Sequence, residues 1–212
     1  MYQLYYFPNN ASLAPHFLLH HLQCDYELML VDRKNNGQKS AEYLKLNPAG
    51  RIPTLLDDGR AIFESAAICI HLCEQHPEAG LMPALGDPKR AEFFQWLSYL
   101  NNTLQADLLV RHYPQRHTTD EAAIPSVVAA QDKRIGDALG IIDEQLSKHQ
   151  YLLGDTLSAC DYFLFMLCRW ALPCAQSPRD FPHLLQHLKA LGESQTVMAV
   201  CEKEGVDPAL FA

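Results

Sequence analysis

The sequence predicts an α/β domain followed by an all-helical domain, and three observations lead to this expectation. Residues 1–77 alternate short apolar runs with helical patterns, in the order strand, helix, strand, helix, strand, strand, helix. Residues 78–86 contain proline and glycine but no periodic pattern. Residues 87–212 repeatedly place apolar side chains at helical spacing. We therefore expect a first domain at 1–77, a linker at 78–86 and a helical domain at 87–212.

The composition is that of a globular protein with no nucleic-acid or membrane partner. The chain has 212 residues, 48% of them hydrophobic, which is enough to bury a substantial core. Its 17 basic and 25 acidic residues give a net charge of −8, which argues against nucleic-acid binding. Seven cysteines include no Cys-x-x-Cys pair, a usage typical of a reducing compartment. The start has no basic leader and the longest apolar run, 162–168, is too short to cross a bilayer, so we expect a cytoplasmic protein.

The first elements follow from short local patterns. Leu4 to Phe7 is aromatic and apolar enough for a strand, and Pro8 ends it. Ser12 precedes apolar residues at helical spacing, so it should occupy a helix N-cap or first turn. The next expected elements are a strand at 26–31, a polar loop at 32–39 and a short helix at 41–46.

The stretch from Asn47 to Ser65 constrains the structure most tightly. Residues 47–50, Asn-Pro-Ala-Gly, have the composition of a turn. Two apolar runs then flank Asp58-Gly59, the strongest short-range signal for a β-hairpin. Beyond the hairpin the apolar spacing becomes helical, so Ser65 lies at a helix N-terminus, where anions bind.

Pro53 affects which backbone groups of the preceding residue, Ile52, are available to a ligand. Proline lacks an N–H and cannot lie in the middle of a sheet, so Pro53 is either the first residue of a strand or part of a cis turn. Either position would leave the N–H and C=O of Ile52 available to a ligand.

The second half contains helix signals throughout. Asp87-Pro88 is a strong helix start, an N-cap residue followed by proline. Ser158 and Asp161 form a capping pattern before a segment, 162–172, that is apolar nearly all round and should be the buried centre of this half. The other expected helices are a long one with Phe93, Leu97, Leu100, Leu104 and Leu108 on one face, a second long one with Val128, Ile135, Leu139, Ile142 and Leu146, and two more at 182–191 and 195–204.

The order turn, Ile-Pro, hairpin, Glu-Ser, helix resembles the glutathione-binding half of the cytosolic glutathione transferase family. A second motif, Leu-Gly-Asp-x-x-Ser-x-x-Asp at 153–161, resembles the interior capping motif of the same family. The resemblance implies that the first domain is thioredoxin-like and that glutathione is a substrate. It also implies a homodimer that conjugates the glutathione thiolate to small electrophiles.

The resemblance assigns roles to individual residues. The backbone of Ile52, before Pro53, would pair with the cysteinyl unit of glutathione. Glu64 and Ser65 would hold its γ-glutamyl end, and Lys39 would face its glycyl carboxylate. A net negative protein that binds an anion needs such a local cation.

The thiol of glutathione needs a donor, because a free thiol with a pKa near ~8.5 is mostly protonated at neutral pH. Ser12 is the first candidate, since it follows the strand and opens a helix whose dipole favours a thiolate. Tyr6 is the second candidate, because Tyr6-Phe7-Pro8 resembles the segment that carries the catalytic tyrosine in tyrosine-type classes. Asn10 is the third, as an amide donor.

Residues 5–16 are similar to the start of the bacterial beta class, but two departures from that class leave the transferase class open. The reactive cysteine of that class falls on Ala11, and its substrate-site histidine falls on Gln105. The Ser-Ser-Cys signature of maleylacetoacetate isomerases is also absent from the sequence. A non-catalytic transferase-like binding or regulatory protein and a glutathione-dependent disulfide reductase or peroxidase remain alternatives.

No metal site is expected. His16, His20, His21 and Cys24 share one predicted helix, and Cys69 and Cys73 are one turn apart on another. A metal would need a complete set of coordinated ligands. Surface histidines and buried free cysteines are the simpler interpretation.

Overall fold

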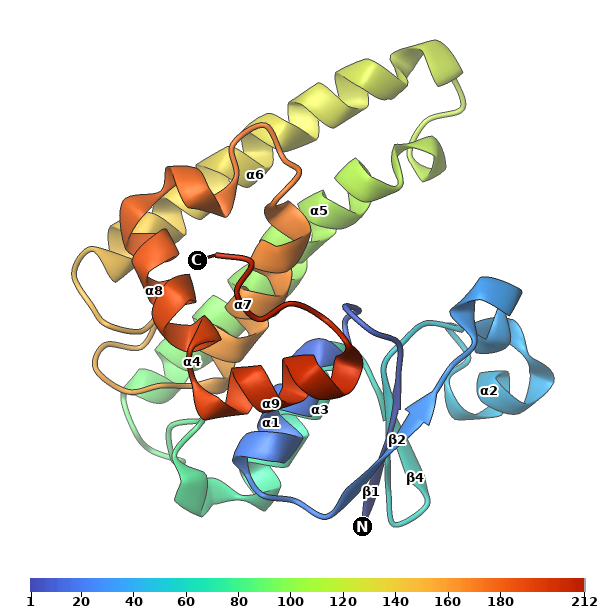
Figure 1. Ribbon diagram of the computed structural model, residues 1–212, viewed down its shortest axis with the longest axis vertical. Coiled ribbons are helices and arrows are strands. Elements are labelled where there is room, and N and C mark those ends of the chain that lie inside the picture. The colour runs from blue at the N-terminus through green and yellow to red at the C-terminus, as the bar shows by residue number, and fades with distance from the viewer. Residues whose placement is uncertain (212) are drawn as a thin grey trace. The chain divides into compact units, whose positions relative to one another are not determined.

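The computed structural model describes residues 1–211 and divides into two compact units (Figure 1). The first unit comprises Met1–Ala84 and Gly192–Ala209, and the second comprises Leu85–Leu191 with Leu210 and Phe211. The first unit is α/β and the second is helical, as the sequence predicts. Because 192–209 belongs to the first unit, this division differs from the domain boundaries that the sequence predicts.

A four-stranded sheet forms the base of the first unit, in the order β2-β1-β3-β4. The central strand β1 pairs in parallel with β2 and antiparallel with β3, while β3 and β4 form the predicted hairpin. Leu4 of β1 lies opposite Leu55 of β3 and both side chains are fully buried, so these partners anchor the register of the sheet. The strands are β1 (Tyr2–Tyr6), β2 (Tyr26–Leu30), β3 (Thr54–Asp57) and β4 (Arg60–Phe63).

Helices α1 and α3 pack against each other, and α9 packs on α1. This contact explains why α9 belongs to the first unit: its face of Val197, Val200 and Cys201 is buried. The sequence shows that face but not its partner, which lies far away along the chain. The helices of this unit are α1 (Leu13–His21), α2 (Ala41–Leu46), α3 (Ser65–Gln75) and α9 (Gln195–Glu204).

The first long helix of the second unit contains a π-helical segment, Leu100–Leu104, between α4 and α5. All five apolar residues predicted to share one face of this helix are buried. Three of the four intervals between these residues are four residues long. In a regular α-helix with 3.6 residues per turn, side chains at that spacing drift away from one face, and the wider π turn corrects the drift. The helix begins at Lys89, one residue later than expected, with Pro88 at the N-cap, and the carboxylate of Asp87 accepts the N–H of Lys89 at 2.8 Å. The helices of this unit are α4 (Lys89–Tyr99), α5 (Gln105–His112), α6 (Ile124–Leu146), α7 (Ala159–Ala171) and α8 (Pro182–Gly192).

Helix α7 is the buried centre of the second unit, as expected. Its residues from Ala159 to Arg169 are all buried. The carboxylate of Asp161 accepts the N–H of Ser158 at 2.8 Å, its hydroxyl at 2.8 Å and the N–H of Leu152 at 3.0 Å. The predicted capping pattern therefore fixes both the helix start and the preceding turn.

Short 3-10 turns complete the connections. The predicted polar loop holds two of them, at Arg33–Asn35 and Gly37–Lys39. The others are at Pro77–Ala79, Pro114–Arg116, Glu121–Ala123 and Pro178–Asp180. Within residues 1–211, none of the helices combines the length and the hydrophobicity that crossing a membrane requires.

Candidate functional site

Three segments of the first unit meet beyond the carboxyl end of β1. They are the loop from Phe7 to Ser12, the turn that leads into β3, and the start of α3. Pairing of Tyr5 with Thr54 brings the end of β1 beside the start of β3. The hydroxyl of Ser65 donates to the carbonyl of Ala11, which joins α3 to the loop. These segments carry most of the residues that the sequence assigns to the site.

The peptide bond between Ile52 and Pro53 is cis, one of the two positions expected for this proline. The carbonyl of Arg51 accepts the Tyr43 hydroxyl at 2.7 Å and the amide of Asn47 at 2.9 Å. Because the Tyr43 hydroxyl is committed to Arg51, the hydroxyl of Thr54 donates to Tyr43 at 2.9 Å. The residues flanking the cis bond are therefore anchored.

The backbone of Ile52 is left available between these anchors. Within residues 1–211, neither its N–H nor its C=O takes part in a hydrogen bond, although its side chain is buried against Val31 and Tyr43. A peptide-like ligand could pair with both groups as a neighbouring strand would.

Glu64 and Ser65 are adjacent at the start of α3 but face different surroundings. Glu64 is exposed and has φ of +74°, a left-handed conformation that few non-glycine residues adopt. Ser65 is buried and its hydroxyl already donates to Ala11. Ser65 can still accept a hydrogen bond, and the first N–H groups of α3 have no partner within the helix. This end of α3 is therefore suited to an anionic or zwitterionic ligand.

Ser12 lies immediately before α1 but its hydroxyl faces the protein. It is fully buried, donates to the carbonyl of Phe7 at 3.2 Å and accepts the N–H of Phe7 at 3.4 Å. Within the described chain, this hydroxyl makes no capping bond to α1. Ser12 therefore closes the loop against the end of β1.

Tyr6 and Asn10 offer donors that are less committed. Asn10 is half-buried, and its side-chain oxygen accepts the N–H of Ala11 at 2.8 Å. Within residues 1–211, the amide nitrogen of Asn10 donates to no partner. Tyr6 is also half-buried, and its pKa is raised by burial and then by the carboxylate of Glu204. Tyr6 is thus kept protonated and able to donate.

Lys39 is exposed and lies across the turn that precedes Ile52. Its Nζ donates to the carbonyl of Ala49 at 3.1 Å. Gly50 has φ of +57°, and a Cβ at this position would lie only 2.6 Å from that Nζ. Glycine therefore allows both the turn and the close approach of the ammonium group.

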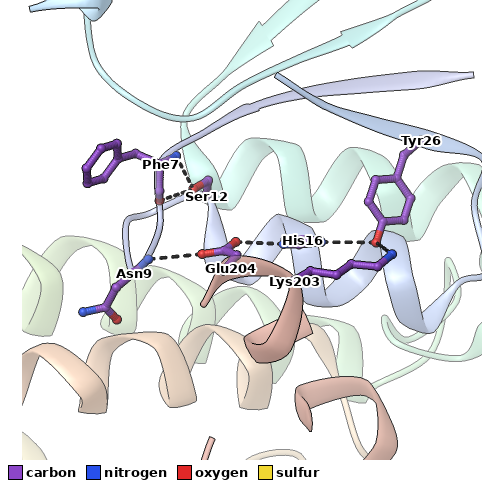
Figure 2. A network of polar contacts seen from close by, with 7 residues as sticks. All are labelled: Phe7, Asn9, Ser12, His16, Tyr26, Lys203 and Glu204. Atoms are coloured by element: carbon purple, nitrogen blue, oxygen red, sulfur yellow. Dashed lines mark hydrogen bonds and ion pairs between the residues drawn. The ribbon is translucent and has the colours of Figure 1, made fainter. Parts of the chain in front are cut away.

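The site contains two residues that the sequence analysis did not identify, His16 and Glu204 (Figure 2). Contrary to the expectation of surface histidines, His16 is fully buried, and its Nδ1 lies 2.8 Å from Oε1 of Glu204. Oε2 of Glu204 accepts the N–H of Asn9 at 3.1 Å. A signal for Glu204 exists, because it continues the apolar face of Val197, Val200 and Cys201, where an acidic residue needs a partner.

The cysteines and Gln105, which the sequence analysis also considered, are distributed over both units. Six of the seven cysteines are buried and Cys24 is half-buried. Gln105 follows the π-helical segment of the second unit, and its side-chain oxygen is buried without a hydrogen-bond partner among the described residues. Within residues 1–211, histidine, cysteine and acidic side chains form no group able to hold a metal ion.

Comparison with known proteins assigns the family. The model of the glutathione S-transferase N-terminal domain matches residues 1–74, and that of the C-terminal domain matches 125–190. The chain is 30% identical over 205 residues to glutathione S-transferase GST-4.5 of Xanthomonas campestris, covering 97% of this chain and 100% of that protein. It is 27% identical over 206 residues to glutathione S-transferase GstA of Escherichia coli O157:H7, covering 96% and 99%.

A solved structure agrees with this assignment. A sphingomonad glutathione S-transferase complexed with glutathione superposes with a TM-score of 0.84 at 26% identity, covering 96% of this chain and 98% of that one. With two matched domains and relatives this similar over nearly its full length, the chain belongs to the glutathione S-transferase family.

Proposed function

We propose that this protein binds glutathione and conjugates its thiolate to small electrophiles. The observation that carries the proposal is the available backbone of Ile52, held beside the cis proline between the anchored residues Arg51 and Thr54. The cysteinyl unit of glutathione would pair with Ile52. The N-terminus of α3, with Glu64 and Ser65, would take the γ-glutamyl end.

Lys39 completes this proposed arrangement at the glycyl end. Its ammonium group lies over the turn at Ala49 and Gly50, close in sequence to Ile52. A carboxylate there would gain an ionic partner in a protein whose net charge is −8.

The thiolate of bound glutathione would be stabilised by a donor from the loop after β1. Tyr6 and Asn10 can supply one without breaking any hydrogen bond within residues 1–211. Ser12 can do so only if its hydroxyl turns away from Phe7. The proposal therefore keeps all three residues, with Ser12 now requiring a local rearrangement.

The physiological setting is part of the proposal. Seven cysteines without a Cys-x-x-Cys pair fit a reducing compartment, and we place the protein in the cytoplasm. We also propose a homodimer, the state that the resemblance implies. Equilibrium sedimentation tests it, and a monomer at micromolar concentration would contradict it.

Calorimetric titration of glutathione, followed by an electrophile panel on the same sample, tests the function. We expect saturable heat and a melting temperature that rises with glutathione concentration, because ligand bound only to the folded state stabilises it. We also expect conjugate formation with at least one electrophile. Binding without conjugation of any electrophile would favour the non-catalytic alternative, and no heat at millimolar glutathione would defeat glutathione binding altogether.

A further inference from the structure

We propose that Glu204, through His16, is a positioning residue that holds residues 9–12 in the conformation needed by the glutathione thiol. We call residues 9–12 the thiol loop. That this loop serves the glutathione thiol rests on the proposed function. The contacts that hold the loop in place do not depend on that function. It brings the end of α9 into the site, although α9 lies at the far end of the sequence.

Glu204 lies in the interior of the protein, where a carboxylate needs partners. The side chains of Glu204 and His16 are both fully buried, and burial of a carboxylate is unfavourable unless its oxygens are paired. Both oxygens of Glu204 are paired, Oε1 with Nδ1 of His16 at 2.8 Å and Oε2 with the N–H of Asn9 at 3.1 Å. A buried ion pair is weak evidence for stability, so packing of α9 alone does not explain a glutamate here.

Figure 2 shows the contacts that Glu204 and Tyr26 make with His16. A carboxylate only accepts, so Nδ1 of His16 carries the hydrogen in this bond. The other ring nitrogen, Nε2, lies 3.2 Å from the hydroxyl of Tyr26, and Lys203 donates to that hydroxyl at 3.1 Å. His16 is thus held on both sides, and its orientation toward Glu204 is fixed.

Glu204 also holds one end of the thiol loop. Asn9 has φ of +55°, a left-handed conformation that costs an ordinary residue energy. Its N–H is held by Glu204 at one end of the loop, and the carbonyl of Ala11 is held by Ser65 at the other. Asn10, a candidate thiolate donor, lies between these two points.

Glu204 has two opposite effects on the pKa of bound glutathione's thiol, one through its negative charge and one through its hold on the thiol loop. The negative charge of Glu204 disfavours a nearby anion, so neutralising it would lower the pKa of bound glutathione's thiol if charge were all that mattered. Release of the thiol loop has the opposite effect, because donors move away from the sulfur. The sign of the pKa change therefore distinguishes the two roles.

The test compares Glu204→Gln with Glu202→Gln, a matched change at an exposed position of the same helix. In protein without glutathione, we expect the amide of Asn9 to exchange its hydrogen at least tenfold faster in Glu204→Gln than in the wild type or Glu202→Gln. This readout does not require glutathione. Unchanged exchange at Asn9 would overturn the proposal even if the protein proves to be an active transferase.

The second readout uses bound glutathione. We expect the absorbance of the thiolate to appear at higher pH in Glu204→Gln, with turnover lower by about 10- to 100-fold, as for a small displacement of reacting groups. The dissociation constant for glutathione should change less than threefold, because Ile52 and the start of α3 are untouched. A thiol pKa that falls or stays fixed would overturn the positioning role. If the wild type binds no glutathione, the proposed function fails and the exchange result alone decides how the loop is held.

Two variants at His16 test the same hydrogen bond independently, so the test does not depend on correct folding of Glu204→Gln. The amide nitrogen of asparagine can replace Nδ1 of histidine as a donor, whereas leucine cannot. We expect His16→Leu to raise the thiol pKa and speed exchange at Asn9, and His16→Asn to remain closer to the wild type in both. Equal effects of the two variants would show that the hydrogen bond to Glu204 does not transmit the effect.

Discussion

A thiolate bound beside the thiol loop needs a donor that the protein has not already committed. The hydroxyl of Ser12 is committed to Phe7, whereas among the described residues the amide nitrogen of Asn10 and the hydroxyl of Tyr6 have no hydrogen-bond partner. Burial, and to a lesser extent the carboxylate of Glu204, raises the pKa of Tyr6, so Tyr6 remains a neutral donor through the physiological range. At the scale of single residues, the site therefore offers a choice of donors that mutation can resolve.

Three variants separate the candidates by the pKa of bound glutathione's thiol. The variant that removes the true donor should raise this pKa, so that thiolate absorbance appears at higher pH, and should slow conjugation by about a hundredfold or more. We expect this result for Asn10→Ala or Tyr6→Phe. Ser12→Ala should instead lower the free energy of unfolding by about 1 kcal/mol, since it removes a buried hydrogen bond.

The reverse pattern is equally informative. If Ser12→Ala raises the thiol pKa while the other two variants leave it fixed, the hydroxyl of Ser12 turns toward the sulfur on binding. If none of the three changes the pKa, a backbone N–H supplies the donor.

A variant of Ser65 tests the proposed contact with the γ-glutamyl end of glutathione. Ser65→Ala removes a hydroxyl that donates to Ala11 and can also accept from the γ-glutamyl group. We expect the affinity for glutathione to fall by about 1 kcal/mol, measured by calorimetry, because one hydrogen bond is lost while the backbone N–H groups of α3 remain. Ser40→Ala, which changes the serine that caps α2, is a control for general destabilisation. Equal affinity in Ser65→Ala and the wild type would remove Ser65 from the site.

At the scale of elements, the capped start of α7 anchors the second unit. Asp161 accepts three hydrogen bonds in the interior, and burial raises the pKa of its carboxyl group. The charge itself is therefore costly, and the benefit of Asp161 comes from satisfying buried donors of Leu152 and Ser158.

Replacement of Asp161 should therefore destabilise the protein strongly. Asp161→Ala leaves two buried N–H groups and a hydroxyl without their acceptor, so we expect a loss of about 3 kcal/mol or more in urea unfolding. Asp155→Ala, at an exposed position in the preceding loop, should change stability by less than about 0.5 kcal/mol. A loss in Asp161→Ala as small as that of the control would contradict the anchoring role.

The elements differ in how far the sequence could predict them. The hairpin, the bounds of α2 and the cap of α7 were predictable because turn and capping residues act over a few positions. The packing of α9 on α1 was not predictable, because an apolar face does not reveal which helix it contacts. His16 was wrongly expected at the surface for the same reason, since its partner Glu204 is 188 residues away. The orientation of Ser12 depends on one backbone hydrogen bond, and sequence patterns do not resolve that.

At the scale of the whole molecule, charge opposes the proposed ligand. The protein carries a net charge of −8 and glutathione is a net anion, so long-range electrostatics repel them. The ammonium group of Lys39 is a local positive charge, held over the turn before Ile52 by the carbonyl of Ala49. Salt screens long-range interactions between exposed charges more than those at close contact.

These opposing terms give a prediction about salt. Lys39→Met removes the local attraction and leaves the repulsion, so glutathione should bind more weakly at low salt, and added salt should strengthen its binding to this variant. In the wild type, added salt should leave the affinity unchanged or weaken it, because the contact with Lys39 is screened as well. Lys45→Met makes the same change in net charge at an exposed position of α2 and should behave like the wild type. Titrations at several ionic strengths measure both effects. If Lys39→Met and Lys45→Met show the same affinity and the same dependence on salt, net charge alone explains the result and Lys39 does not face the glycyl carboxylate.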